Sequence, residues 1–170
     1  FRMLAEDEIG NSLLANIGNA IAWLFIPLGW GNWQATVASF TGLIAKENIV
    51  GTMGILYGGS GAVYTNIAAA FTMLSGYSFL AFNLLCAPCF AAIGAIKREM
   101  NSAKWTLFAV GYQCGFAYAV ALIIYQLGML FTGQGNIIGS IVAFALVALF
   151  VFMLVRPYKE ASTLKAKVRV

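Results

Sequence analysis

Long charge-free stretches dominate the pattern of polar and apolar positions along this chain. Three of them run from Ile9 to Ala45, from Asn48 to Ile96 and from Trp105 to Val155. A helix needs roughly 20 apolar residues to cross a bilayer, so each stretch can hold one crossing and the last two can each hold two. We therefore expect an all-α, polytopic helical membrane protein with about four to five membrane segments.

The first 33 residues are expected to form an amphipathic or interfacial helix and an entry loop. Between Asn11 and Ile26 large apolar residues recur at helical spacing, and small polar residues occupy the other face. A Pro-Leu-Gly sequence from Pro27 ends this helix. Trp30 and Trp33 come next, and we place them at the level of the lipid headgroups, where aromatic anchors are common.

Residues 34–75 are expected to form a gate segment with a broken or re-entrant helix. The part from Gln34 to Tyr57 is long enough to cross, but it contains several glycines and a charged pair near its middle. Irregular backbone at membrane depth is tolerated where it lines a cavity or is buried in protein. A glycine-rich turn over residues 58–61 leads to a short helix from Ala62 to Ser75.

Residues 76–155 are expected to form three transmembrane helices, from Gly76 to Ile96, Trp105 to Leu127 and Ile138 to Val155. A basic loop separates the first two helices, and residues 156–170 form a basic tail. The positive-inside rule places the loop and the tail, and hence the carboxy terminus, in the cytoplasm. The uncharged turn from Thr132 to Asn136 then faces outward.

Composition agrees with lipid as the solvent. Of the 170 residues, 61% are hydrophobic and 9% are charged, whereas a soluble domain carries about 25% charged residues. The net charge of +4 does not indicate nucleic-acid binding, because the basic residues flank apolar spans. The chain begins without Met or a signal-peptide pattern and has no phosphate-loop motif, so we interpret it as a piece of a longer protein.

Lys46 and Glu47 are the candidates that physical chemistry singles out first. Ionisable residues inside an apolar span cost several kcal/mol and usually face a cavity or a partner. Side chains of adjacent residues on a helix point about 100° apart, so each of the two needs its own partner or water. Two interpretations stay open: a carboxylate that coordinates or gates a cation beside the glycine-rich face of Gly51 and Gly54, or a buried structural ion pair.

Cys86 and Cys89 form a CxxC pattern within an apolar span. In a helix the two thiols point to roughly one side, and Pro88 supplies no amide proton, which frees the carbonyl of Leu84. Thiolate, carboxylate and carbonyl groups can bind Fe(II) in a chain that has no His. Buried packing of the cysteines and a simple proline kink are the alternative interpretation.

Two stretches resemble the ferrous-iron transporter B family, which belongs to the Feo system. The first runs from Asn32 to Thr52 and contains NWQATV and TGLIAKE. The second runs from Tyr77 to Glu99 and contains LLCAPC before a basic loop. With the later spans included, the resemblance covers nearly the whole chain.

This resemblance implies a permease for Fe2+ uptake in the bacterial inner membrane. The chain would supply its second permease half, with the second gate motif, and would not be an enzyme itself. The first permease half and an amino-terminal GTPase domain, with its GTP and Mg2+, would belong to the full-length protein. The implied partners are Fe2+, the lipid bilayer, those two regions and further copies of the chain, with no cofactor bound in this part and no nucleic acid.

The resemblance also suggests roles for particular residues. Candidates for the ion path are Cys89, Glu47 and, as a secondary candidate, Cys86. Lys46 is a gate charge or a partner charge, and flexibility of the gate would come from Gly51, Gly54 and Pro88.

Two functions of other kinds remain as alternatives. A gate-type carrier of another substrate, such as nucleosides, shares the broken-helix architecture. A membrane dithiol oxidoreductase would use Cys86 and Cys89 together.

Overall fold

A computed structural model describes residues 13–42, 45–58, 62–86, 89–133 and 135–156. The elements in that part of the chain are all helical and run in the order α2 (Leu13–Ala22), η1 (Trp23–Leu28), α3 (Trp33–Gly42), α4 (Asn48–Leu56), α5 (Val63–Ala70), α6 (Met73–Leu85), α7 (Phe90–Met100), α8 (Ala103–Phe131) and α9 (Ile137–Val155). The predicted all-α fold is therefore confirmed. The predictions for the basic tail beyond Arg156, for Pro88, for residues 59–61 and for the first 12 residues lie outside the described residues.

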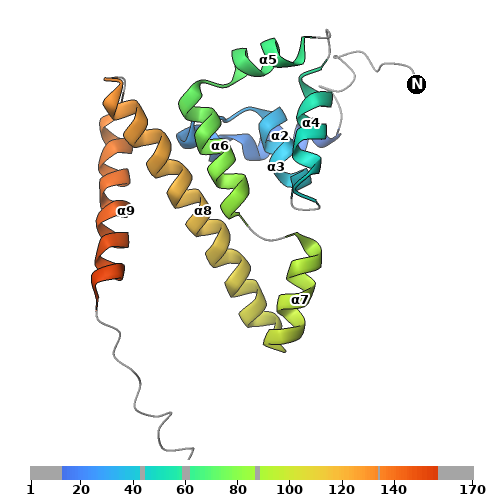
Figure 1. The fold of residues 1–170 in the computed structure, drawn as a ribbon, viewed down its shortest axis with the longest axis vertical. Helices are drawn as coiled ribbons and strands as arrows, with labels where there is room; N and C mark the ends of the chain where they lie inside the picture. The colour runs from blue at the N-terminus through green and yellow to red at the C-terminus, as the bar shows by residue number, and fades with distance from the viewer. Residues whose placement is uncertain (1–12, 43–44, 59–61, 87–88, 134, 157–170) are drawn as a thin grey trace, which may run out of the picture.

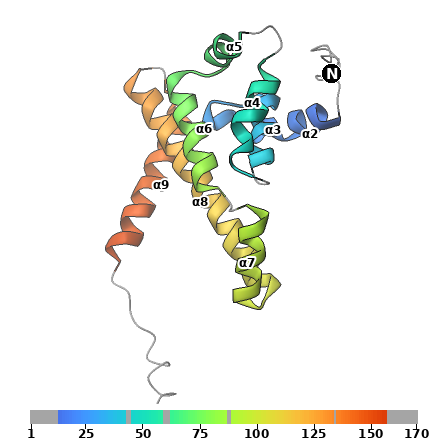
Figure 2. The ribbon, with the colours of Figure 1, turned by 45° about the vertical axis from the view of Figure 1, so that its right-hand side comes forward.

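The long helix α8 is the axis of the fold. It runs diagonally through Figure 1, with α9 antiparallel on one side and α6 along its upper half on the other. Helix α7 turns back along the beginning of α8, and η1 also contacts α8. Helices α2, α3 and α4 form a layer beside α6, which both views show on the side away from α9 (Figure 2).

Of the helices that the structure describes, two are long and apolar enough to cross a membrane, and both lie in the second half of the chain. They are α8 and α9, and most of their surface is exposed in the isolated chain. A third crossing results if α5 and α6 are counted as one span, although they meet at a bend of 96°. Large apolar side chains along α9 point outward, as in a helix that lipid surrounds.

One helix interruption lies where a broken helix was predicted, and a second lies inside a predicted transmembrane helix. The expected broken helix from Gln34 to Tyr57 is confirmed, since α3 ends at Gly42 and α4 begins at Asn48. The span expected from Gly76 to Ile96 is two helices, because α6 ends at Leu85 and α7 begins at Phe90. A count of four to five crossings therefore has to include interrupted helices, which do not span the membrane by their own length.

The buried centre of the fold is a cluster of aromatic rings. Trp30 stacks on Phe25 with ring centroids 4.4 Å apart and lies edge-on to Phe79 of α6 at 5.1 Å. Phe82 contacts the same two rings of the entry segment. Trp30 is only 1% exposed, so its predicted place as a headgroup anchor is wrong. Its ring fills the core because the turn after η1 brings it back against α6.

Polar side chains of α8 and α6 bind backbone carbonyls of neighbouring segments. Tyr118 donates to the carbonyl of Leu24 at 2.8 Å, and Gln126 donates to that of Pro27 at 2.8 Å. Ser78 of α6 donates to the carbonyl of Ala121 at 3.0 Å within the α6–α8 contact. These bonds fix the 3₁₀ segment η1 and helix α6 against α8, since a carbonyl without a partner is costly in an apolar medium.

Gly29 provides a direct test of how η1 meets α8. Its φ of +86° is unfavourable for other residues, and an added Cβ would collide with the ring of Tyr125. We expect Gly29→Ala to lower the stability of the detergent-solubilised protein by at least about 1 kcal/mol. The measurement is the apparent Tm. Gly76→Ala is the matched control, because a Cβ at that helical glycine meets nothing within 4 Å. An equal decrease of the apparent Tm in both variants would contradict the packing of η1 on α8.

Candidate ion-path site

Two helix breaks meet in space, and their contact defines the candidate site. One break, between α3 and α4, carries Lys46 and Glu47; the other, between α6 and α7, carries the cysteine pattern. Lys46 donates from Nζ to the carbonyl oxygen of Leu84 at 3.0 Å. A bond between residues so distant in sequence ties one break directly to the other.

The carbonyl of Leu84 is available because its own helix cannot supply a donor. In a continuing helix it would accept the amide hydrogen of residue 88, which is proline and has none. Helix α6 instead ends at Leu85, and Cys86 has extended backbone, with φ −60° and ψ 169°. The last carbonyls of a helix carry partial negative charge, so an ammonium group is well placed there. The partner of Lys46 is thus a helix end.

Glu47 is not the partner of Lys46. It precedes α4, its side chain makes no capping hydrogen bond, and it is exposed. Within the described ranges it forms no ion pair with a basic side chain. Its carboxylate is therefore exposed and is not paired with Lys46.

The thiol contact differs from the one suggested by the CxxC pattern. Cys86 Sγ lies 3.6 Å from Sγ of Cys114 on α8, and no disulfide joins them. Cys89 is half-buried and stands at the start of α7. The CxxC pattern does not predict Cys114 as the neighbour of Cys86, because their proximity depends on how α6 packs against α8.

The thiol contact lies deep in the long helix. At ~1.5 Å per residue, Cys114 stands about 16 Å from the start of α8 and about 26 Å from its end at Phe131. Leu84 is close to Cys86 in the sequence, so the bond to Lys46 lies near the same level. A helix of this length that crosses the hydrocarbon layer, which is ~30 Å thick, would place Cys114 within that layer.

The acidic and thiol groups do not converge into one cage. Among the residues that the structure describes, His, Cys, Asp and Glu form no group of three or more that could hold a metal ion. Gly51 and Gly54 have open space around them, since an added Cβ at either meets nothing within 4 Å. No described residue of this chain therefore packs closely against these two glycines.

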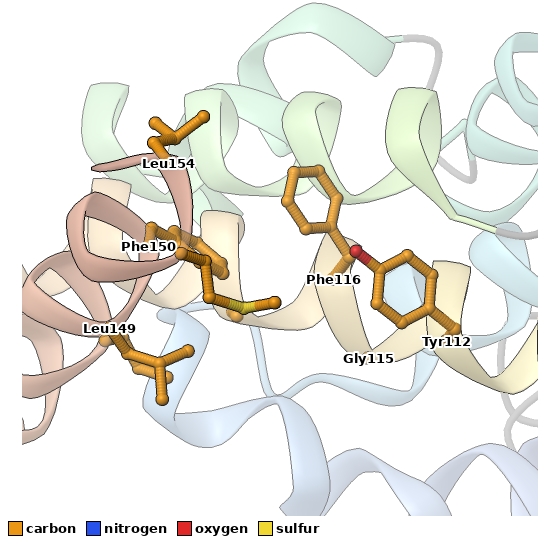
Figure 3. Close-up of a pocket in the computed structure, with 9 residues that line it drawn as sticks. Tyr112, Gly115, Phe116, Leu149, Phe150 and Leu154 are labelled. Atoms are coloured by element: carbon orange, nitrogen blue, oxygen red, sulfur yellow. The ribbon is translucent and has the colours of Figure 1, made fainter. Parts of the chain in front are cut away.

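An apolar groove between α8 and α9 lies apart from these groups. It encloses about 610 Å³ and is lined in Figure 3 by Tyr112, Gly115 and Phe116 of α8, facing Leu149, Phe150 and Leu154 of α9. Its lining has little polar surface, as expected of a groove that contacts lipid or another apolar helix. The polar side-chain atoms in its lining are the Tyr112 hydroxyl and the Met153 sulfur.

Oxidative cross-linking tests the thiol geometry. We expect mild oxidation with copper phenanthroline to join Cys86 to Cys114, because a small side-chain movement brings the sulfurs to bonding distance. Peptide mapping under non-reducing conditions measures the linkage. It should persist in Cys89→Ser and disappear in Cys114→Ser. A dominant Cys86–Cys89 linkage would contradict the placement of Cys86 against α8.

Comparison with known proteins shows which family this chain resembles. Residues 4–103 match the family model Gate, described as nucleoside recognition. The chain is 46% identical over 123 residues to Fe(2+) transporter FeoB of Methanocaldococcus jannaschii, covering 72% of this chain and 18% of that protein. It is 42% identical over 125 residues to Fe(2+) transporter FeoB of Staphylococcus aureus strain COL, covering 73% and 19%.

A fused relative shows the same partial coverage. The Fe(2+) transport protein A/Fe(2+) transporter FeoB fusion protein of Porphyromonas gingivalis is 30% identical over 141 residues, covering 74% of this chain and 17% of that protein. The chain thus spans less than a fifth of the length of these relatives. No solved structure matches. The predicted resemblance to ferrous-iron transporter B proteins is confirmed, and the chain belongs to the Gate family of membrane proteins.

Proposed function

We propose that this chain is part of a permease that takes Fe2+ across a bacterial inner membrane. The observation that supports it most is the meeting of two helix breaks through Lys46 and Leu84, in a chain similar to proteins named Fe(2+) transporters. Broken helices at membrane depth expose carbonyls and helix ends, which are the groups that bind ions in many transporters.

The residues near the two breaks supply a ligand set suited to a ferrous ion in transit. Glu47 offers an exposed carboxylate, and Cys89 and Cys86 offer thiols on either side of the α6–α7 break. Oxygen and sulfur ligands together accept Fe(II), and transport needs ligands that bind an ion weakly enough to release it. Flexibility of the gate would come from Gly51 and Gly54 within α4 and from Pro88, which lies outside the described residues.

The remaining parts of the mechanism belong to regions outside this chain. A first permease half would complete the pathway, and an amino-terminal GTPase domain with GTP and Mg2+ would control it. The basic loop after α7 and the basic tail would face the cytoplasm, which orients α8 outward and α9 inward. Association of several copies is compatible with the exposed apolar faces of α8 and α9.

Two other functions make different demands on substrate and on the cysteines, so they can be distinguished from this proposal. The description of the Gate family favours a nucleoside carrier as the second candidate, which would be inhibited by nucleosides and indifferent to Fe2+. A dithiol oxidoreductase would need Cys86 and Cys89 as its pair, whereas Cys86 contacts Cys114.

Uptake of radioactive Fe2+ by cells that express the full-length transporter tests the proposal. We expect Cys89→Ser and Glu47→Gln each to lower the uptake rate about tenfold or more, by analogy with the 10- to 100-fold loss of metal affinity when groups around a metal are removed. Glu99→Gln, at the exposed end of α7, is the matched carboxylate control and should leave uptake unchanged.

The outcome is read at equal expression of all variants. Normal uptake in both Cys89→Ser and Glu47→Gln would remove these residues from the ion path. Uptake of a labelled nucleoside, with no effect of Fe2+, would favour the second candidate.

A further inference from the structure

The bond between Lys46 and Leu84 places a positive charge where a transported cation would find a free carbonyl. We propose that the Leu84 carbonyl is a cation-binding position and that Lys46 occupies it as a tethered competitor of the ion. This inference rests on the proposed transport of Fe2+ and assigns a particular step of it to one lysine.

The acceptor is suited to a cation. Its own helix offers no amide hydrogen to it, because the residue four positions later is proline. It lies at the carboxyl end of α6, where the partial charges of the last carbonyls attract positive charge. Lys46 satisfies it at 3.0 Å with a group that carries a full charge.

The donor is placed so that it can leave. Lys46 stands between α3 and α4, and its contact with Leu84 lies on the exposed side of the structure. A lysine side chain is a flexible stem with a single charged end, so rotation about its bonds withdraws the ammonium without unfolding a helix. Glu47, the next residue, presents an open carboxylate beside it.

The ammonium and a divalent cation exclude each other at this position. Like charges at contact distance repel strongly, and the repulsion increases where water is scarce. An arriving ion that gains the Leu84 carbonyl therefore displaces Lys46. Glu47 follows Lys46 in the sequence, and Cys86 and Cys89 lie two and five residues after Leu84. When the ion departs, the lysine returns and satisfies the carbonyl again, so the site is never left with an unpaired acceptor.

Transport kinetics of the full-length protein test this competition. In proteoliposomes, initial rates of Fe2+ uptake are measured over a range of Fe2+ concentrations for Lys46→Gln and Lys46→Arg. We expect Lys46→Gln to lower the apparent KM several-fold and to raise uptake without nucleotide, because the competing charge is gone. Lys46→Arg keeps the charge and should stay near wild type. Lys97→Gln, at the exposed end of α7, is the control for loss of a lysine charge and should change neither quantity.

An unchanged or raised KM in Lys46→Gln overturns the inference. A purely structural capping role would produce the unchanged KM together with a lower maximal rate. A wild-type protein that takes up no Fe2+ overturns the proposed function instead, so the two failures are distinguishable.

A measurement on the wild-type protein avoids any dependence on how the variants fold. Labelling of Lys46 by a small amine-reactive ester is quantified by mass spectrometry under anaerobic conditions, with Fe2+ or with Mg2+. We expect Fe2+ to increase the labelling rate of Lys46 several-fold over Mg2+, because the ion displaces the amine from the carbonyl. Equal rates with the two ions overturn the inference.

Discussion

In hydrocarbon a backbone carbonyl has no water to bind, so every interruption of a helix has to find a donor inside the protein. This constraint explains three hydrogen bonds that join residues far apart in the sequence. Tyr118 and Gln126 of α8 bind the carbonyls of Leu24 and Pro27 in the 3₁₀ segment, and Lys46 binds that of Leu84. The long helix and the lysine therefore hold the irregular segments in place, which allows breaks to exist at membrane depth.

The lysine differs from the other two donors because it carries charge. A neutral donor such as the Tyr118 hydroxyl has no net charge that repels an approaching cation, whereas a charged group in an apolar layer is repelled strongly by it. The contact with a charged donor, from Lys46 to Leu84, thus lies between the two helix breaks, and the two contacts with neutral donors come from α8. That division separates the rigid part of the fold from the part proposed to handle the ion.

Much of this architecture was predictable from the sequence because it depends on local pattern. The break between α3 and α4, the short helix α5 and the long helices α8 and α9 result from glycine positions, charge and the length of apolar runs. The burial of Trp30 was not predictable, since a tryptophan after a turn has the same local pattern at a headgroup as in a core. Its place depends on the rings of Phe79 and Phe82, far along the chain.

Some features of the candidate site were likewise predictable from the sequence and others were not. Lys46 and Glu47 stood out because charge inside an apolar stretch is expensive, and Pro88 predicted the free carbonyl of Leu84. That these two features meet, and that Cys86 contacts Cys114 in place of Cys89, depends on helix packing that no short motif encodes.

The most direct test is a cryo-electron microscopy structure of the full-length protein in a lipid nanodisc without iron. We expect α6 to end near Leu85 within the lipid layer and the Lys46 ammonium to lie within hydrogen-bond distance of the Leu84 carbonyl. A continuous helix through residues 85–90, or a Lys46 side chain paired with a carboxylate at the membrane surface, would contradict the contact between the two helix breaks.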